Sequence, residues 1–486
     1  MFRLLKIGWS TVALSLLAVI FLYVVWILSN SASKERFKNS VSDVIHSIGQ
    51  SKISSFVVHS FARERIAKNG EPIFFQQTVI VDADVFLALT DRLVYKKGSH
   101  PLLFVRGRGD FSVDVKSFSS VKSERIQSFQ GKLKKQNFPL AFDTFDGFDK
   151  KQFEVFPIDV GGHNGWIQLT VTSSNKIINI PIFVEEAPKN DILFVESTDT
   201  FKAYQSGESM RTYYSRVPQS ILGNFTRPNA YPTYYKISHW ALASDDMTVG
   251  GCKDHLINAD LVLKHHLDKL GLVHSVVSDE FFDTDHDLQK YRMIVLGTHN
   301  EYWTAKKIRR VKEYVEKGGS LLILGGNTAW RWVVRSNNYE LFWGDGILKK
   351  DTRYEPFLTQ ILGSYYDEIG YETYAPFKFI DGASLIDVNT QKGSEFGVGS
   401  NFELCKDMIK GASGLETDKF YIKSDGFTVI AKGMNEGGVG GSDVVYKKFA
   451  QSNGQVLNFG SLSLWHRISD PIVQNLILGF HKASKK

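Results

Sequence analysis

The sequence predicts an α/β domain built on a parallel sheet, preceded by an all-β sandwich and by one N-terminal transmembrane helix. Three observations lead to this prediction: an uncharged apolar run near the N-terminus, a series of short alternating apolar segments up to residue 184, and an alternation of strands with helices from residue 191. We therefore expect a membrane anchor at residues 1–33, a β-sandwich at 50–190 and the α/β domain at 191–486.

The composition is that of a globular protein and argues against a nucleic-acid partner. Of 486 residues, 43% are apolar and 13% aromatic, which is enough for two or three cores. The net charge is only +6, and its 58 basic and 52 acidic residues are scattered along the chain. Cys252 and Cys405 are too few for a four-ligand zinc site, so we expect buried thiols or one disulfide.

The N-terminal apolar run is long enough to cross a membrane. Ile7 to Leu28 is a stretch of 22 residues without a charge, and a helix of that length would span about 33 Å. Trp9 and Trp26 lie near its ends, where aromatic rings favour the headgroup level. A short tail before a long domain predicts a single-pass protein whose soluble part is extracytoplasmic, in the periplasm or at the cell surface. The alternative is a signal peptide cleaved near Ser31–Ser33.

The region after the anchor reads as a sandwich of antiparallel strands. Apolar and polar residues alternate in several segments that Gly, Asn, Asp and Ser clusters separate. The predicted strands are 74–81, 102–105, 111–115, 166–171 and 177–184. A polar joint that contains a proline, Glu185–Asn190, then marks the domain boundary.

From Asp191 the pattern changes to strands alternating with helices, which is typical of parallel strands joined by helical crossovers. We expect helices at Asn258–Leu270, Thr304–Lys317 and Asp470–His481. The predicted strands are 192–195, 273–277, 291–296, 320–324, 427–431, 444–446 and 456–459, with a less regular stretch at about 335–425.

Residues that follow the strands are the candidates for a site, because sites in open α/β sheets form at the carboxyl ends of the strands. His299 and Glu301 follow the third strand and are two residues apart, so both side chains point to one side if the chain is extended. An imidazole and a carboxylate there could bind a metal or transfer a proton. Asn327 follows the next strand. The alternative for each residue is an ordinary polar loop position.

Three segments carry a resemblance to a known family: Gly297–Thr304 followed by Gly325–Asn327, Asp199–Tyr204, and Ser461–Trp465. Together they resemble the large (beta) subunit of N,N-dimethylformamidase, especially its C-terminal glutamine-amidotransferase-like domain, over roughly residues 80–485. The resemblance implies an α/β domain of the flavodoxin or class I glutamine-amidotransferase type, placed after the β-sandwich.

The resemblance also implies a mononuclear iron held by two tyrosinates and one glutamate, and hydrolysis of a small formamide. By motif, Tyr204 and Glu301 fall on ligand positions, and His299 and Asn327 join Glu301 as catalytic residues. Phenolate and carboxylate oxygens suit a hard Fe(III) ion. A small partner subunit is implied as well. For the second tyrosine, Tyr234 is preferred over four neighbours that stay open, Tyr213, Tyr214, Tyr231 and Tyr235.

Two functions follow. The first is a membrane-anchored, extracytoplasmic, metal-dependent hydrolase that acts on a small amide or a related C–N bond. The alternative is a non-catalytic envelope protein, acting in binding or assembly of an envelope component, that keeps the amidotransferase-like fold. His299 and Glu301 favour the enzyme, whereas Gln205 and Ser206–Glu208, which depart from the family pattern after Tyr204, favour the alternative.

Three other motifs do not support a site. Asp283–Asp287 begins like a calcium loop, but Leu288 occupies the glycine position. Gly437–Ser442 lacks the lysine of a phosphate-binding loop and precedes a strand. His265 and His266 are adjacent on a helix, so they cannot face one ligand together.

Overall fold

The computed structural model describes most of the chain between residues 59 and 484. The described residues are 59–65, 74–81, 86–118, 122–134, 140–143, 147–148, 153–174, 176–204, 206–207, 210–211, 221–223, 252, 256–335, 340–342, 355–366, 373–380, 392–421, 423–436 and 440–484. The predicted anchor, Ile7–Leu28, lies outside them. Among the described residues, no helix has the length and apolar composition that a membrane span requires.

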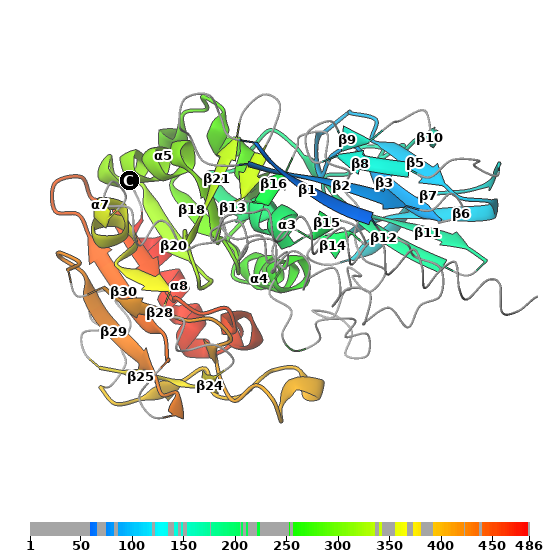
Figure 1. Ribbon diagram of the computed structural model, residues 1–486. Coiled ribbons are helices and arrows are strands. Elements are labelled where there is room, and N and C mark those ends of the chain that lie inside the picture. Colours follow the sequence, from blue (N-terminus) through cyan, green and yellow to red (C-terminus); the bar gives the residue numbers. More distant parts are fainter. Residues whose placement is uncertain are drawn as a thin grey trace, which may run out of the picture.

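The first unit consists of strands in two layers (Figure 1). One sheet has the order β4-β12-β11-β6-β7 and the other the order β10-β5-β3. Their bounds are β3 Leu87–Thr90, β4 Val94–Lys96, β5 Leu102–Arg106, β6 Gly109–Phe118, β7 Ser123–Leu133, β10 Glu154–Pro157, β11 Gly165–Ser173 and β12 Lys176–Glu185. A further sheet, β1-β2-β8-β9, contains β1 His59–Arg65, β2 Phe74–Val81, β8 Leu140–Asp143 and β9 Gly147–Phe148.

Alternating side chains of the two layers form one core. In β6, Val113 and Val115 are buried, while Asp114 between them is partly exposed. The two valines belong to the same cluster as Leu103 and Val105 of β5 in the other sheet. Because successive side chains of a strand point to opposite faces, every second residue fills the space between the layers. This packing accounts for the apolar and polar alternation in the sequence.

The second unit is built on a nine-stranded sheet in the order β17-β13-β18-β20-β31-β30-β29-β25-β26. Its strands are β13 Ile192–Glu196, β17 Ser275–Ser278, β18 Met293–Leu296, β20 Ser320–Ile323, β25 Phe377–Phe379, β26 Glu395–Phe396, β29 Thr428–Gly433, β30 Asp443–Lys448 and β31 Gln455–Asn458. The first five in the sheet order pair in parallel. The other four extend the sheet by antiparallel pairing.

Numbered along the chain, the five parallel strands lie in the order 2-1-3-4-5. Flavodoxin-like sheets have this order, and their ligands bind where the winding reverses, between the first and third strands. In this sheet that point lies between the carboxyl ends of β13 and β18. The antiparallel extension goes beyond that pattern, so the flavodoxin or class I amidotransferase class stays a prediction.

Helices cover both faces of the parallel sheet. Helices α4, Ile257–Lys269, and α8, Pro471–Ala483, share one apolar core with one face, and α5, Ala305–Glu316, packs on the other. Successive side chains of β13 point to opposite faces of the sheet, since Phe194 belongs to the core under α4 and α8 and Val195 to the core under α5. Apolar residues on both faces explain the continuous apolar runs of these strands.

The two units share a packed interface. Trp166 and Phe183 of the sandwich form one cluster with Phe201 and Ile257 of the α/β unit. Glu185, at the end of β12, accepts hydrogen bonds from the backbone N–H of Ser278 at 2.8 Å and from its hydroxyl at 2.9 Å. An apolar cluster and these two hydrogen bonds therefore join the sandwich to the α/β unit.

The remaining described elements are short and surround the main sheet. They are α3 Thr198–Tyr204, α7 Glu355–Phe357, β14 Ser206–Gly207, β15 Met210–Arg211, β16 Ile221–Gly223, β19 Tyr302–Thr304, β21 Arg331–Arg335, β22 Glu340–Phe342, β23 Ser364–Tyr366, β24 Tyr374–Ala375, β27 Ser413–Gly414 and β28 Asp418–Phe420. Single helical turns are η3 Asp279–Asp283, η4 Leu288–Lys290, η5 Leu358–Leu362, η8 Glu403–Cys405 and η10 Leu464–Arg467.

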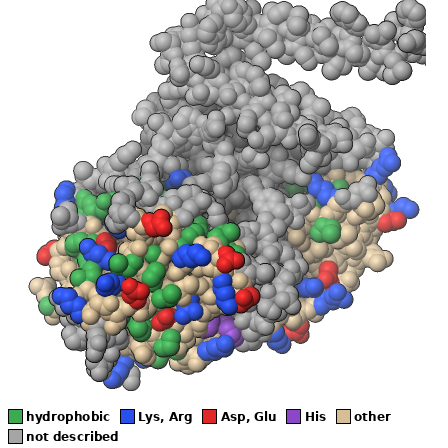
Figure 2. All heavy atoms as spheres, turned by 90° about the horizontal axis from the view of Figure 1, so that it is seen from below, with side chains coloured by type: hydrophobic (Ala, Val, Ile, Leu, Met, Phe, Trp, Pro, Cys, Tyr) green, Lys and Arg blue, Asp and Glu red, His purple; other side chains and the backbone are tan. Residues whose placement is uncertain are grey.

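A disulfide joins Cys252 to Cys405. It ties the residue that lies just ahead of α4 to the irregular stretch before β27. On the face shown in Figure 2, basic and acidic side chains of the described residues are interspersed with apolar ones. This mixture matches the scattered charge of the sequence.

Candidate functional site

The predicted site residues that follow β18 and β20 meet in one buried cluster beyond the carboxyl ends of these two neighbouring strands. His299 and Glu301 follow β18, and the chain between them is extended enough for both side chains to reach the same side. Nε2 of His299 lies 3.5 Å from Oε2 of Glu301. Nδ2 of Asn327, from the loop after β20, lies 3.5 Å from the same imidazole nitrogen. Neither His299 nor Glu301 has any solvent exposure.

The imidazole of His299 is neutral at pH 7. Burial lowers the pKa of His299 to about 4, although the Glu301 carboxylate acts in the opposite direction and Arg331 adds a further lowering. Because the ring carries no charge, its approaches to the carboxylates of Glu301 and Glu416 are not full ion pairs. A neutral imidazole is the form that accepts a proton, so His299 is suited to general base chemistry.

Glu416 is a further member of the cluster that the sequence did not reveal. Its Oε2 lies 3.3 Å from Nε2 of His299 and accepts a hydrogen bond from Nδ2 of Asn327 at 2.7 Å. The residue lies between the short strands β27 and β28, in a stretch where the sequence predicts neither a strand nor a motif. The only signal in the sequence is the acidic pair Glu416 and Asp418.

Asp418 fixes the backbone on which Asn327 stands. Its Oδ1 accepts a hydrogen bond from the backbone N–H of Asn327 at 2.7 Å. Burial raises the pKa of Asp418 to about 7, against the opposing effect of the backbone N–H groups of Asn327 and Thr328. The carboxylate thus holds the Asn327 loop toward the cluster.

The glycines before Asn327 allow this loop to approach His299. A Cβ on Gly325 would lie 1.7 Å from the carbonyl oxygen of Thr298, and one on Gly326 would lie 2.6 Å from that of Glu416. Asn327 itself has a φ of 51°, which asparagine tolerates better than most residues. Two glycines followed by asparagine are therefore the residues that this close packing requires.

Arg331 partly neutralises the carboxylates of the cluster. Its Nε lies 2.7 Å from Oε1 of Glu301, and its Nη1 donates to the hydroxyl of Tyr302 at 3.1 Å. The backbone N–H of Arg331 also donates to the carbonyl of Glu301 at 3.0 Å. One oxygen of Glu301 is thus bound by the guanidinium, while the other faces His299.

A second layer of buried charges holds the residue before His299. Oδ1 of Asp260, on α4, accepts hydrogen bonds from the backbone N–H of Thr298 at 2.6 Å and from its hydroxyl at 2.8 Å. Lys264 pairs with Glu196 in the same layer. Burial, together with the charge of Glu196, raises the pKa of Asp260 well above its usual range.

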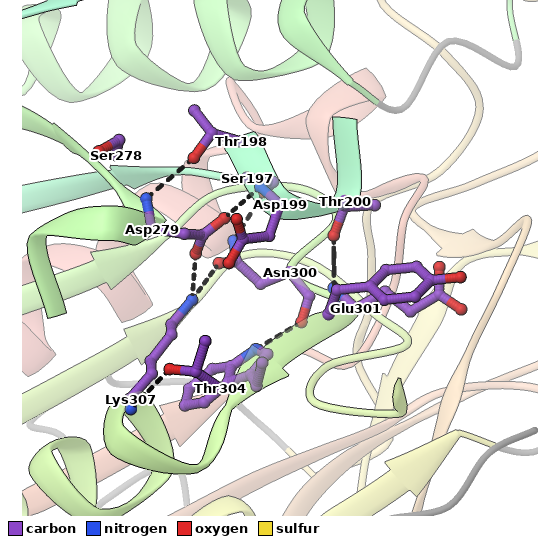
Figure 3. Close-up of polar contacts among 12 residues, drawn as sticks. Ser197, Thr198, Asp199, Thr200, Ser278, Asp279, Asn300, Glu301, Thr304 and Lys307 are labelled. Atoms are coloured by element: carbon purple, nitrogen blue, oxygen red, sulfur yellow. Dashed lines mark hydrogen bonds and ion pairs between the residues drawn. The ribbon is translucent and has the colours of Figure 1, made fainter. Parts of the chain in front are cut away.

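Asn300 points away from His299 and Glu301 into a separate polar group, which Figure 3 shows. Its Oδ1 accepts a hydrogen bond from Nζ of Lys307 at 3.0 Å, and its Nδ2 donates to the hydroxyl of Ser197 at 2.8 Å. Lys307 also pairs with Asp279, which accepts a hydrogen bond from the backbone N–H of Asp199 at 2.8 Å. These side chains are buried on the opposite side of the His299–Glu301 segment.

Of the predicted metal ligands, Glu301 is in the cluster. Tyr204 is the last residue of α3, the helix that follows the carboxyl end of β13. Tyr234 lies outside the described residues. Within the described part of the chain, no group of three or more His, Cys, Asp or Glu side chains is arranged to hold a metal ion. Glu301 supplies the hard oxygen donor that Fe(III) prefers, so this member of the ligand set fits that ion.

The loop that begins like a calcium site and the buried His466 make contacts of their own. Arg310 donates to the carbonyls of Phe282 at 3.0 Å and of Thr284 and His286, so a guanidinium fills the loop that resembles a calcium site. His466 is buried between the hydroxyl of Ser400, 2.9 Å from Nδ1, and the carbonyl of Cys252, 2.8 Å from Nε2. Gly437 to Val439 lie outside the described residues.

Comparison with known proteins identifies one family. The family described as "N,N-dimethylformamidase beta subunit-like, C-terminal" matches residues 158–470, which is more than half of the chain. No curated protein matches the sequence. Among solved structures, one similar chain is titled "mmIFT52 N-terminal domain"; it is 10% identical, with a TM-score of 0.27, and the match covers 44% of this chain and 86% of that one. A score that low supports no statement about fold or function.

Proposed function

Because the chain belongs to the N,N-dimethylformamidase beta subunit-like, C-terminal family, we propose that it hydrolyses an amide or a related C–N bond. The observation that carries the proposal is the buried cluster of His299, Glu301, Asn327 and Glu416. Three of these residues match the motif that carries the family resemblance, and the fourth joins them from a distant part of the chain. A neutral imidazole with two carboxylates beside its Nε2 is an arrangement suited to moving a proton.

In the proposed reaction, His299 takes a proton from the water that attacks the amide carbon. The carboxylate of Glu416, 3.3 Å from Nε2, stabilises the positive charge that then forms on the imidazole. Asn327 holds Glu416 in place through its Nδ2. The imidazolium returns the proton to the leaving nitrogen as the C–N bond breaks, which yields a carboxylic acid and an amine.

A metal ion is part of the proposal through the family resemblance. Tyr204, Tyr234 and Glu301 are the residues that would hold an iron ion. A bound ferric ion would supply Lewis-acid polarisation of the amide carbonyl. Arg331 keeps one oxygen of Glu301 in place through its Nε and leaves the second oxygen on the His299 side.

The proposal places the catalytic domain outside the cytoplasm, attached to a membrane through Ile7–Leu28. The disulfide between Cys252 and Cys405 supports an oxidising compartment, because cytosolic thiols are usually kept reduced. The family name refers to a beta subunit, which supports a further proposal of a small partner subunit. A fusion of alkaline phosphatase to Lys486 should be active in cells, whereas a fluorescent-protein fusion that glows beside a silent phosphatase would contradict this orientation.

The hydrolase proposal is tested on the full chain purified in detergent. Iron is measured by mass spectrometry, and amine release is followed with a panel of formamides and formylated amines. Substitution His299→Gln should lower kcat by about 10²–10⁴ with iron retained, because it removes only the proton acceptor. Glu301→Ala should remove the iron as well. Circular dichroism establishes that each variant is folded.

An opposite result would favour the envelope-protein alternative. If the wild-type chain stays colourless and metal-free after reconstitution with iron, and releases no amine from any member of the panel, the hydrolase proposal fails. A ferric tyrosinate centre would instead give a visible charge-transfer band.

A further inference from the structure

We infer that Asn300, clamped by Lys307, is the positioning residue that keeps His299 and Glu301 on the same side of the chain. The inference rests on the proposed function, because it assigns a role to a neighbour of the two reacting side chains. Asn300 lies between His299 and Glu301 in the sequence, and in the proposed reaction it touches neither the substrate nor the transferred proton.

The side chains of His299, Asn300 and Glu301 point in alternating directions. Side chains of an extended segment alternate between its two sides. His299 and Glu301 approach each other at 3.5 Å on one side, and the Asn300 amide contacts Ser197 and Lys307 on the other. If this segment rotated or slipped by one residue, Asn300 would enter the cluster and both reacting groups would leave it.

Asn300 is held by both polar groups of its side chain and by its backbone carbonyl. Its side-chain oxygen and nitrogen bind Lys307 and Ser197. Its backbone carbonyl accepts hydrogen bonds from the indole N–H of Trp303 at 2.7 Å and from the backbone N–H of Ala329 at 2.9 Å. Four separate contacts to a single buried residue define one orientation of the peptide.

Lys307 is itself anchored by buried contacts. Its Nζ lies 4.1 Å from the centre of the Trp303 ring and pairs with the buried carboxylate of Asp279. Asp279 in turn accepts from the backbone N–H of Asp199, and its own N–H donates to the hydroxyl of Thr198 at 3.0 Å. We call the contacts that Lys307 makes with Asn300 and Asp279 the clamp. Because Asp279 also binds the backbone of Asp199, the clamp links the loops after β13, β17 and β18, as Figure 3 shows.

The clamp predicts a graded series of variants. Asn300→Ala removes both side-chain contacts and should lower kcat by about 10- to 100-fold with little change in KM, because small misplacements of catalytic groups are costly. Asn300→Asp keeps an oxygen for Lys307 and should lose less. Asn179→Ala is the matched control, since it removes a buried amide that accepts from Thr170 in the sandwich sheet.

The NMR signal of the His299 ring distinguishes a positioning role of Asn300 from a general effect on stability. It is recorded on histidine-labelled protein at one fixed pH. The signal is assigned by its loss in His299→Gln. Asn300→Ala should shift or split it, Asn300→Asp should move it less, and Asn179→Ala should leave it unchanged. This measurement does not need a substrate, so it tests the clamp even if no amide is hydrolysed.

Lys307 provides an independent check. Lys307→Met leaves Asp279 buried without its cation and can prevent folding, whereas the double variant Lys307→Met/Asp279→Leu removes both charges. The double variant should fold and should still shift the His299 signal, because the contact to Asn300 is missing. A wild-type His299 signal in folded Asn300→Ala and in the double variant, or an equal shift in Asn179→Ala, would overturn the inference.

Discussion

Oε2 of Glu416 lies 3.3 Å from Nε2 of His299, although the two residues are far apart in the sequence. One follows the third parallel strand in the chain, and the other belongs to the irregular stretch before β28. Their meeting places a carboxylate beside a neutral imidazole in a buried site. We regard this contact as the part of the site on which a proton transfer would depend.

Substitution Glu416→Gln should therefore lower kcat by about 10²-fold or more, because an amide stabilises the imidazolium far less than a carboxylate does. The fold should persist, since the replacement has the same shape. Amine release by the purified full chain measures the effect. Glu403→Gln is the control, as Glu403 pairs with Lys406 at the surface. Equal rates for the two variants would remove Glu416 from the mechanism.

Gly325→Ala should disrupt the site and destabilise the protein. The added Cβ would lie 1.7 Å from the carbonyl oxygen of Thr298, so the loop that carries Asn327 would have to move away from His299. We expect an unfolding free energy lower by at least about 2 kcal/mol, measured by urea denaturation. Gly162→Ala is the control, because a Cβ there meets nothing within 4 Å. A stability equal to that of the control would show that the loop can relax without cost.

Stability should fall as the pH decreases below about 6.5, in part because of His466. Burial lowers the pKa of His466 to about 3, against a raising effect of the Cys252 carbonyl. The unfolded chain, with an ordinary histidine pKa near 6.5, then binds more protons than the folded one between these two pKa values. Stability from this group is present above pH 6.5 and is lost by about 1.4 kcal/mol per pH unit down to pH 3.

Urea denaturation at pH 7, 6 and 5 compares the wild-type chain with His466→Gln. The variant should show a shallower loss of stability toward low pH, and the difference between the two curves isolates His466 from the other titrating groups. Parallel curves would mean that His466 is not buried in its neutral form.

Loss of the disulfide should destabilise the protein without removing the cluster. Cys252 and Cys405 are 153 residues apart in the sequence, and a cross-link over so long a loop stabilises a fold by roughly 3–5 kcal/mol. Cys252→Ala/Cys405→Ala should therefore lower Tm in calorimetry, and reductant should lower the Tm of the wild-type chain by a similar amount. A Tm that neither change affects would mean that the two thiols are not bonded in the protein.

The elements of the α/β unit follow from the sequence because their signals are local. The strand predicted at 291–296 appears as Met293–Leu296, and the helix predicted at Thr304–Lys317 appears as Ala305–Glu316. Thr304 begins that helix because its hydroxyl accepts a hydrogen bond from the backbone N–H of Lys307 at 3.1 Å. Patterns of this kind are set within a few residues.

The sequence by itself predicted that His299 and Glu301 face the same side if their segment is extended, since residues two apart in an extended segment do so. It also placed Asn327 at the end of the next strand of the sheet. Only the tertiary structure brought in Glu416 and Lys307, because one belongs to a stretch without periodicity and the other is a lysine that the helix pattern assigns to the surface. Contacts between distant segments depend on how the sheet winds, and no local pattern encodes them.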